Sequence, residues 1–580
     1  MILHALTQYY DALAARGEIS PPGWCDAKVS FALKIGEDGG LLGIFPLRLP
    51  SADGKKEVPQ ILRVPEQVKK TVDIKSNFLC ENSSYLLGLD SKGKPTRTLQ
   101  CFEAACAKHR EVLSGVDSPT ARAVLAYFDR WDPAQASSHP ALSGILDDIL
   151  KGGNLVFWVE GGYAQDDPAI RTAWETYRGA KDVPAGRCLV TGEVAPVALL
   201  HPSIKGVRDA QSSGASLVSF NADAFESYGK ELRDKTGQGF NAPVSERAAF
   251  AYGTALNHLL ADRAHVQYIG DTTVVYWAAD GDPLCQDLFG MRMFGTPSNR
   301  VTQNDLDRIL RSVLDGVAPD GFPLQPDNHF YVLGLAPSAA RLSVRFFYAD
   351  TFARTMRHVE EHSERLRIVP EQPTPYLWRL LNETVNRNGR DKKASPPMAG
   401  AVMRAILTGS AYPATLFEMT MIRIRAEQAV TRGRAAILKA FLLKNNLYAI
   451  PKEVLTVELN EQSTYLPYVL GRLFAVLERV QLAANPGIKA TIKDKYFNSA
   501  SATPATIFPL LTKLSQSHLR KLSAAYRIYF EKLIGDLEGR IHQTLPTRLP
   551  LPEQGTFHLG YYHQVQKFFE RKQKEETNDV

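Results

Sequence analysis

Apolar residues recur along the first half of the chain with two spacings, which predict helices and strands in alternation. Residues 2–16 place their apolar side chains on one helical stripe. Strict alternation over 29–35, a Glu-Asp-Gly-Gly turn and a second apolar run over 42–49 predict a β-hairpin. Helices capped by Ser245 and Thr302 are also expected. These two helices cover 245–264 and 306–314, and two or three more lie within 100–150. The remaining expected strands are 84–89, 155–159, 188–192, 272–278, 330–335 and 341–347.

From about residue 351 the spacing becomes almost entirely helical, with Pro and Gly in the connectors. The expected helices are 375–385, 399–409, 413–428, 434–445, 464–482, 504–517, 523–541 and 556–572. A chain of 580 residues is too long for one core. The pattern therefore predicts an α+β fold class. A mixed α/β domain with antiparallel strands covers 1–367, and an all-α helical-bundle domain covers 368–580.

One long stretch, residues 201–241, follows neither spacing and is dense in Ser, Gly, Gln and Asn with a few basic residues. Short hydrogen-bonding side chains on a Gly-bearing backbone can approach a phosphate or a base edge closely. A second polar loop places Lys75 beside Ser76 and Asn77, a combination that suits the same contacts. Each stretch is equally well explained as a surface loop or turn without a partner.

The net charge of +6 is unevenly distributed along the chain. Residues 351–450 carry 16 Lys and Arg against 8 Asp and Glu, and residues 451–580 carry 17 against 13. Arg341 and Arg345 also lie on one face of the expected strand 341–347. A local basic excess suits a nucleic-acid track. For any single residue, a solvated helix face or a surface salt bridge is the commoner explanation.

The sequence contains no apolar run long enough to predict a membrane span. Its N-terminal residues lack the basic segment and continuous apolar core of a signal peptide. Six scattered cysteines predict no disulfide framework, which suits a reducing compartment. We therefore expect a cytoplasmic protein.

A search for catalytic motifs finds no Walker loop, no dinucleotide-binding glycine motif and no nucleophile elbow. One segment, His358 to His362, fits the H-x-x-E-H pattern of zinc peptidases. A helix would bring both histidines to one face, with Glu361 as the base and Glu418 or Glu427 as a third ligand. The segment also reads as a charged, solvated helix face. A binding subunit without metal or cofactor is therefore favoured, with a zinc-dependent hydrolase as the alternative.

Longer motifs extend over nearly the whole chain. They are C-L-V-T-G (188–192), H-P-S-I-K-G (201–206), Q-S-S-G-A-S-L-V-S-F-N (211–221), A-F-E-S-Y-G-K (224–230), Q-G-F-N-A-P (238–243), A-Y-G-T-A-L-N-H-L-L (251–260), G-D-T-T-V-V-Y-W (270–277), F-Y-V-L-G-L-A-P-S-A-A-R-L-S-V-R-F-F (330–347), Y-V-L-G-R-L-F-A-V-L-E (468–478) and Q-G-T-F-H-L-G-Y-Y-H-Q (554–564). Together they resemble the large subunit of type I-C CRISPR Cascade surveillance complexes. One difference is an insertion-like segment, Leu232 to Gly237.

This resemblance implies a non-catalytic subunit of an RNA-guided antiviral complex. Such a subunit reads the protospacer-adjacent motif in double-stranded DNA, helps to separate the strands, stabilises the R-loop and recruits a helicase–nuclease. The implied partners are the crRNA-bearing backbone and 5′-end subunits, the small subunit and the target DNA, with no membrane. The C-terminal helices resemble the small subunit, and Met419 or Met421 marks a possible internal start.

Within this role, the residue types suggest three sets of contacts. Contacts with the motif duplex are expected from Lys75, Ser76, Asn77, Asn82, Gln211, Ser212, Ser213 and Gly214. Phosphate contacts are expected from Lys205, Arg208, Lys230, Arg341 and Arg345. A track for the displaced strand is expected from Arg423, Arg425, Arg432, Arg434, Arg472 and Arg479.

Overall fold

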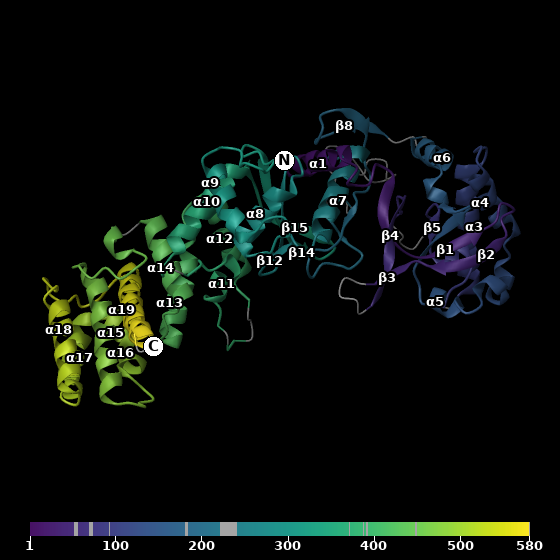
Figure 1. Cartoon of the computed structure of the whole chain (residues 1–580). Coiled ribbons are helices and arrows are strands. Elements are labelled where there is room, and N and C mark those ends of the chain that lie inside the picture. The colour runs from purple at the N-terminus through teal and green to yellow at the C-terminus, as the bar shows by residue number, and fades with distance from the viewer. Residues whose placement is uncertain are drawn as a thin grey trace. The chain divides into compact units, whose positions relative to one another are not determined.

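The computed structural model in Figure 1 describes the chain except for residues 51–55, 69–73, 92, 180–183, 221–239, 371, 387, 390–392, 447–448 and 579–580, and omits the side chains of 570–578. The chain divides into two compact units. The first comprises Leu3–Pro202 and Phe220–Ala255, and the second comprises Ser203–Ser219 and Leu256–Val580. This division does not coincide with the boundary expected at 367/368, because the strands after residue 256 share a core with the C-terminal helices.

The first unit is built on a seven-stranded sheet with the order β3-β4-β1-β6-β5, in which β2 pairs with β1 and β7 pairs with β6. The central pair, β1 and β6, is parallel, and the other pairs are antiparallel. The hairpin expected at 29–49 is confirmed as β1 and β2. The strands are β1 (Trp24–Ile35), β2 (Leu41–Pro46), β3 (Arg48–Pro50), β4 (Glu57–Pro65), β5 (Cys80–Glu81), β6 (Asn154–Val159) and β7 (Gly162–Tyr163).

Helices pack on this sheet around a core that includes Phe31, Phe78 and Phe157. The helices of this region are α1 (Ile2–Ala15), α2 (Ser83–Leu86), α3 (Pro95–Leu113), α4 (Pro119–Arg130), α5 (Leu146–Leu150) and α6 (Pro168–Gly179). Short 3₁₀ helices lie at Pro133–Ser138, Pro140–Leu142 and Ala164–Asp166. The helices expected within 100–150 and the strand at 155–159 are confirmed. Helix α6 was not predicted.

Two strands expected in this unit are wrong, and in both cases local hydrogen bonds explain the difference. Residues 84–89 are not a strand, because the Asn82 side chain accepts the Ser84 N–H and starts helix α2 there. Residues 188–192 form the turn between β8 (Ala185–Arg187) and β9 (Val194–Pro196). The Cys188 Sγ accepts the N–H groups of Val190 and Thr191 and closes that turn.

A six-stranded sheet organises the first half of the second unit, with the order β10-β11-β15-β14-β13-β12. Only the β11–β15 pair is parallel. Gly334 pairs with Phe346 and Leu335 with Val344, so Arg345 is the extra residue of a β-bulge. The strands are β10 (Ser203–Ile204), β11 (Ala215–Ser216), β12 (Gln267–Ile269), β13 (Thr272–Ala278), β14 (His329–Ser338) and β15 (Arg341–Thr351).

Helices cover one face of this sheet and continue into the C-terminal bundle, sharing a single apolar core with it (Figure 1). Side chains alternate along β13, so Val274 and Tyr276 join this core, whereas Thr273 faces the other way. The helices are α7 (Glu246–Ala261, which begins in the first unit), α8 (Pro283–Phe294), α9 (Gln303–Leu314), α10 (Phe352–Leu366), α11 (Leu377–Asn382), α12 (Pro396–Thr408), α13 (Ala414–Glu427), α14 (Arg432–Asn445), α15 (Leu466–Ala484), α16 (Ile492–Ala502), α17 (Pro504–Leu519), α18 (Ala524–Glu538) and α19 (Leu551–Asn578), with a 3₁₀ helix at Lys452–Val454.

The mixed α/β region followed by helices confirms the expected fold class, and every C-terminal helix that was predicted is present. The expected caps are confirmed: Thr302 forms a capping box with Asp305, and the Ser245 hydroxyl accepts the Ala248 N–H. Helices α8 and α16 were not predicted. Helix α8 is buried on nearly all sides and so lacks an amphipathic pattern. Among the described helices, none is both long enough and apolar enough to cross a membrane.

Candidate nucleic-acid interface

The second unit presents an exposed basic and polar loop between β10 and β11, which we call the 203–216 loop. Its ends are closed by the pairs Ser203–Ser216 and Ile204–Ala215. Gly214 makes this closure possible. Its φ is +99°, and an added Cβ would lie 2.9 Å from the Ser203 Cβ and 3.1 Å from the Ile204 carbonyl oxygen. Gly214 therefore has a structural role in the loop, and it is itself buried.

The backbone of the 203–216 loop is fixed to its neighbours by side-chain hydrogen bonds. Asn257 on α7 accepts the Lys205 N–H at 2.8 Å and donates to the Ser203 carbonyl at 3.1 Å. Thr273 on β13 accepts the Arg208 N–H at 3.0 Å. The loop backbone is therefore held against helix α7 and strand β13. Fixing the backbone in this way lowers the entropy lost when the loop binds a partner.

The side chains of this anchored loop point outward. Five of the residues expected to meet DNA are exposed here, namely Lys205, Arg208, Gln211, Ser212 and Ser213. Together they offer two cations and three groups that both donate and accept hydrogen bonds. That mixture is the one that phosphates and base edges require. The structure thus brings the loop half of the expected site together on one surface.

An aromatic residue orders the central cation of this surface. The Arg208 guanidinium carbon lies 3.5 Å from the centre of the Tyr268 ring, which is a cation–π contact. Arg263 approaches the same ring from its edge and donates to the Tyr268 hydroxyl at 3.3 Å. Two arginines therefore converge on one tyrosine at strand β12. Sequence reasoning missed Arg263, Tyr268 and Asn257, which lie outside the polar stretch that drew attention to the loop.

The two arginines expected as a cationic pair on strand 341–347 lie on β15, beside the loop's second strand. Arg341 pairs in register with Ser216 of β11. Arg345 donates to the Asp271 carboxylate at 2.7 Å. The sequence placed Arg345 on the same face as Arg341 because side chains alternate along a strand. Arg345 is the bulge residue, so this alternation is interrupted before it. Asp271 neutralises part of its charge, so Arg345 offers a phosphate less than the exposed Arg208 does.

The remaining expected motif contacts lie in the first unit, where most of them serve the fold. Ser76 and Asn77 are buried. Asn77 accepts the Val68 N–H at 2.8 Å and donates its own N–H to Glu81 at 2.9 Å. Asn82 is the N-cap of α2. Only Lys75 of this set is exposed. Lys230 and the insertion-like segment Leu232 to Gly237 lie outside the described residues.

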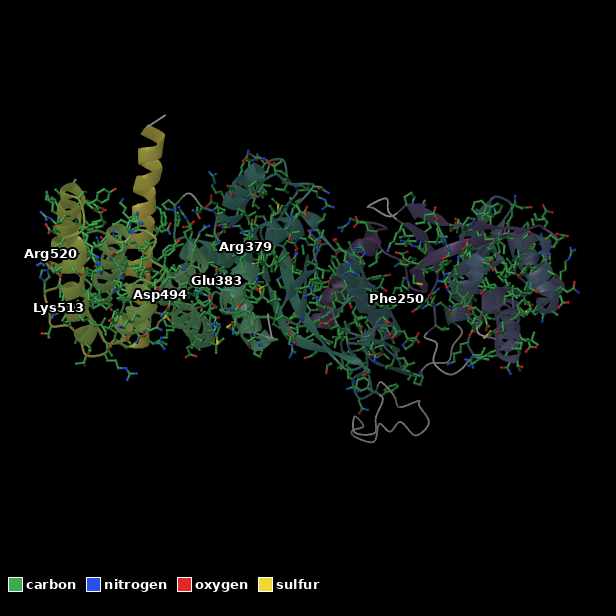
Figure 2. The ribbon with its side chains drawn as sticks, turned by 90° about the horizontal axis from the view of Figure 1, so that it is seen from below. Phe250, Arg379, Glu383, Asp494, Lys513 and Arg520 are labelled. Carbon is green, nitrogen blue, oxygen red and sulfur yellow. The ribbon has the colours of Figure 1, made fainter. Side chains whose placement is uncertain are left out.

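Two of the six arginines expected as a strand track are buried inside the helical bundle. Arg434 donates to Glu427 at 2.5 Å and to the Ala429 carbonyl at 3.0 Å, and it pairs with Glu383, which Figure 2 labels. Arg472 donates to the Gln564 side chain and to the carbonyls of Asn460 and Glu461. Burial lowers the pKa of the Arg472 guanidinium. Both cations hold the bundle together, and neither is available to a phosphate.

The other four arginines are partly buried. Arg425 donates to the Gln554 amide at 2.5 Å, Arg432 donates to the Pro373 carbonyl, and Arg423 lies 3.7 Å from Glu427. Arg423 and Arg425 are two residues apart on one helix, which directs them about 200° apart. With Arg479 on another helix, α15, these side chains do not form one exposed line. By contrast, Lys513 and Arg520 at α17 are exposed (Figure 2).

The H-x-x-E-H segment lies on α10, but its side chains have structural partners. His358 Nδ1 contacts the Leu407 carbonyl oxygen at 2.6 Å, and His362 Nδ1 contacts the Tyr412 hydroxyl at 2.6 Å. Burial lowers the pKa of His362 to about 3. Glu361 pairs with Arg365, and Glu427 pairs with Arg434. Within the described ranges no three His, Cys, Asp or Glu side chains gather as metal ligands would. Nothing in this geometry favours the zinc-hydrolase alternative.

Comparison with known proteins gives one family. No curated protein matches the chain in sequence. The model of the family described as CRISPR-associated protein (Cas_Csd1) matches residues 6–569, which is nearly the full length. The match includes both compact units, the 203–216 loop and the C-terminal bundle. The chain therefore belongs to this CRISPR-associated family of Cascade large subunits.

Proposed function

We propose that this chain is the non-catalytic large subunit of a type I-C Cascade complex and that it recognises the protospacer-adjacent motif in double-stranded DNA. Two observations support the proposal. The family match runs over nearly the whole chain. The 203–216 loop also presents exposed cations and hydrogen-bonding side chains on a backbone fixed by Asn257 and Thr273. In such complexes base pairing reads the target, and the protein reads only a few base pairs and the shape of the backbone.

The loop divides naturally into a phosphate-binding part and a base-reading part. Lys205 and Arg208 would bind phosphates and so fix the register of the duplex. Gln211, Ser212 and Ser213 at the exposed turn would meet base edges, where an amide can make two hydrogen bonds to adenine. Gly214 contributes by closing the hairpin rather than by direct contact. The main support for this assignment is that the loop is both exposed and anchored to its neighbours.

Further steps of the proposal concern strand separation and the partners of the complex. Once the motif is bound, the subunit would help to open the duplex, stabilise the R-loop and present the displaced strand to a helicase–nuclease. The partners are the crRNA-bearing backbone and 5′-end subunits and the small subunit. For the displaced strand, exposed cations such as Lys513 and Arg520 suit phosphate contacts better than the buried Arg434 and Arg472. Arg341, Arg345 and Lys230 remain proposed phosphate contacts, and Lys75 remains a proposed contact with the motif duplex.

The proposal is tested with the assembled crRNA-bearing complex and target duplexes with and without the adjacent motif. Affinity is measured over a range of salt concentrations. Arg208→Ala should weaken binding to both duplexes and lower the salt slope by about one. Gln211→Ala should instead reduce the preference for the motif, by about 1–3 kcal/mol at one base pair. Arg122→Ala, an exposed arginine of α4 paired with Asp117, is the control. Unchanged motif preference in Gln211→Ala and Ser213→Ala variants would remove the loop from the reading role.

A further inference from the structure

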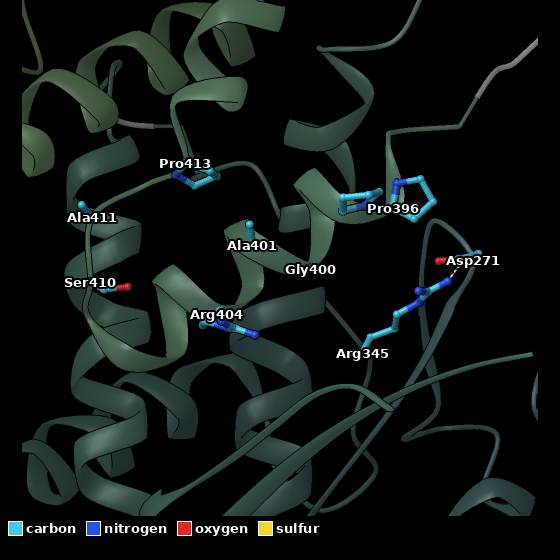
Figure 3. Close-up of a pocket in the computed structure, with 10 residues that line it drawn as sticks. Asp271, Arg345, Pro396, Gly400, Ala401, Arg404, Ser410, Ala411 and Pro413 are labelled. Atoms are coloured by element: carbon cyan, nitrogen blue, oxygen red, sulfur yellow. Dashed lines mark hydrogen bonds and ion pairs between the residues drawn. The ribbon is translucent and has the colours of Figure 1, made fainter. Parts of the chain in front are cut away.

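A pocket in the second unit lies between strand β15 and helix α12, and none of the described residues that line it belongs to the 203–216 loop (Figure 3). Its volume is about 570 Å³. That size is within the range of small-molecule sites. Its lining includes Asp271, Arg345, Gly400, Arg404 and Ser410, together with three prolines and two alanines. None of the described residues of the first unit lines it. Sequence reasoning singled out Arg345 alone among these residues.

Two arginines supply the positive charge of the pocket, and they differ in how they are held. Arg345 is fixed by its 2.7 Å hydrogen bond to Asp271, and Asp271 is itself fixed by the Thr272 hydroxyl at 3.1 Å. Arg404 is exposed on α12, and in the part of the chain that the structure describes its guanidinium has no hydrogen-bond or ion-pair partner. Figure 3 shows the two side chains reaching the pocket from different elements. One carboxylate against two guanidinium groups leaves a net positive charge for an anion.

The rest of the lining is mostly apolar. Three proline rings and two alanines provide most of it, with the Ser410 hydroxyl as a polar point. Gly400 and Ala401 are adjacent to this surface on the α12 face that also carries Arg404. Among the described residues, a Cβ added at Gly400 would meet no atom within 4 Å, so the glycine leaves open space. A ligand that suits this lining combines an anionic group with a weakly polar body, as a nucleotide does.

We infer that this pocket binds one unstacked nucleotide of a single strand, with the base against the prolines and the phosphate between Arg345 and Arg404. A base pair within a duplex is stacked on both sides and cannot enter such a recess, whereas a base of an unpaired strand can turn into it. This inference rests on the proposed function in one respect, namely that target DNA opened by the complex supplies the strand. It adds a base-binding subsite that differs from the motif-reading loop in position and in the form of DNA bound.

The inference is tested on the full-length chain with a short oligodeoxythymidine and an abasic oligomer of the same length and charge. Base binding predicts that the chain prefers oligodeoxythymidine by about tenfold or more. Gly400→Phe fills the pocket and should remove that preference while leaving the salt-dependent binding that both oligomers share. Arg404→Ala should weaken both oligomers together. Gly535→Phe is the matched control, because Gly535 on α18 also has no described atom within 4 Å of an added Cβ. This variant should keep the preference.

Equal affinity of the wild-type chain for the two oligomers would overturn the inference, as would a preference that survives in Gly400→Phe. If Gly400→Phe does not fold, an oligomer carrying 5-iododeoxyuridine is cross-linked to the wild-type chain. Cross-links within 396–413 support the pocket, and cross-links confined elsewhere contradict it. An acidic peptide that displaces the oligomer from the wild type but not from Gly400→Phe would assign the pocket to a protein partner.

The same preparations separate this inference from the proposed function. Motif-dependent duplex binding by the assembled complex is measured in parallel with the oligomer preference. If motif dependence is intact and the base preference is absent, the pocket inference fails alone. If the base preference is present and the wild-type complex ignores the motif, the motif-reading proposal fails and the pocket inference stands.

Discussion

The guanidinium of Arg208 lies over the ring of Tyr268, 3.5 Å from its centre, while Arg263 donates to the hydroxyl of the same tyrosine. These residues come from the 203–216 loop, from strand β12 and from the connection before it. The Tyr268 ring therefore keeps the two guanidinium groups near each other on the surface, although their like charges repel. Such an arrangement suits an anion that bridges both arginines, as a phosphate does.

Substitution of Tyr268 tests whether this arrangement orders the loop. Tyr268→Ala removes the ring below Arg208, and we expect target-duplex affinity to fall about two- to fivefold, since an exposed cation–π contact contributes roughly 0.5–1 kcal/mol. Tyr268→Phe keeps the ring and loses only the hydroxyl contact with Arg263, so its affinity should stay nearer to the wild type. The measurement is equilibrium binding by the assembled complex. An equal loss in both variants would show that the hydroxyl, not the ring, matters.

Asn257 is the second support of the loop, because its side chain contacts both Lys205 and Ser203. Asn257→Ala leaves these two backbone groups without that partner and should loosen the loop without unfolding the unit. We expect faster amide hydrogen exchange over 203–208 and a weaker preference for the motif, at a cost of about 1–3 kcal/mol in local stability. If amide hydrogen exchange over 203–208 is unchanged in Asn257→Ala, the loop is held by other contacts.

The helical bundle depends on a close crossing of α15 and α19 at two glycines. A Cβ added to Gly471 would overlap the Phe557 carbonyl oxygen, and one added to Gly560 would overlap that of Tyr468. Gly471→Ala should therefore push the helices apart and destabilise the bundle by about 2–4 kcal/mol, despite the better helix propensity of alanine. Thermal or denaturant unfolding measures this. Gly535→Ala, at an uncrowded helical position, should be neutral or slightly stabilising; equal effects of the two would contradict the close crossing.

His265 gives the second unit a defined pH dependence. Burial alone would lower the pKa of His265, but hydrogen bonds to Asp262 at 2.6 Å and to Asp287 at 2.7 Å outweigh it and raise the pKa to about 9. Arg300 also contacts Asp287. A pKa raised above the unfolded value of about 6.5 stabilises the fold fully below pH 6.5, and this contribution, on the order of 3 kcal/mol, is lost as pH rises to about 9.

The test compares the free energy of unfolding of wild type and His265→Gln between pH 6 and pH 9.5. The wild type should lose stability across this range, whereas the variant should be less stable at pH 6 and change little with pH. A variant with the same slope as the wild type would show that another group causes the dependence.

Most of the fold follows from local patterns in the sequence. The C-terminal helices were predictable because their apolar stripes recur at helical spacing between Pro and Gly connectors. Failures occur where tertiary context overrides the pattern. Residues 84–89 look like a strand, yet the Asn82 cap starts a helix there. Helix α8 is buried almost all round, so it has no polar face to reveal its period.

The candidate site was only partly predictable, and the reason is burial. Polar composition pointed to Lys205, Arg208 and Gln211, which are exposed, but it could not distinguish them from Ser76 and Asn77, which are buried inside the first unit. Asn257 and Tyr268 escaped notice because their role depends on strands and helices that meet only in the folded unit. Basic residues in helices also gave no sign that Arg434 and Arg472 face inward.

Photo-cross-linking from position 211 tests the central claim most directly. A photoreactive phenylalanine derivative replaces Gln211, and the assembled complex is irradiated with a labelled duplex that carries the motif beside the target. We predict cross-links to the motif base pairs, and far fewer to a duplex in which the motif is replaced. Cross-links from the same position to another subunit, or to DNA regardless of the motif, would contradict motif reading by the 203–216 loop.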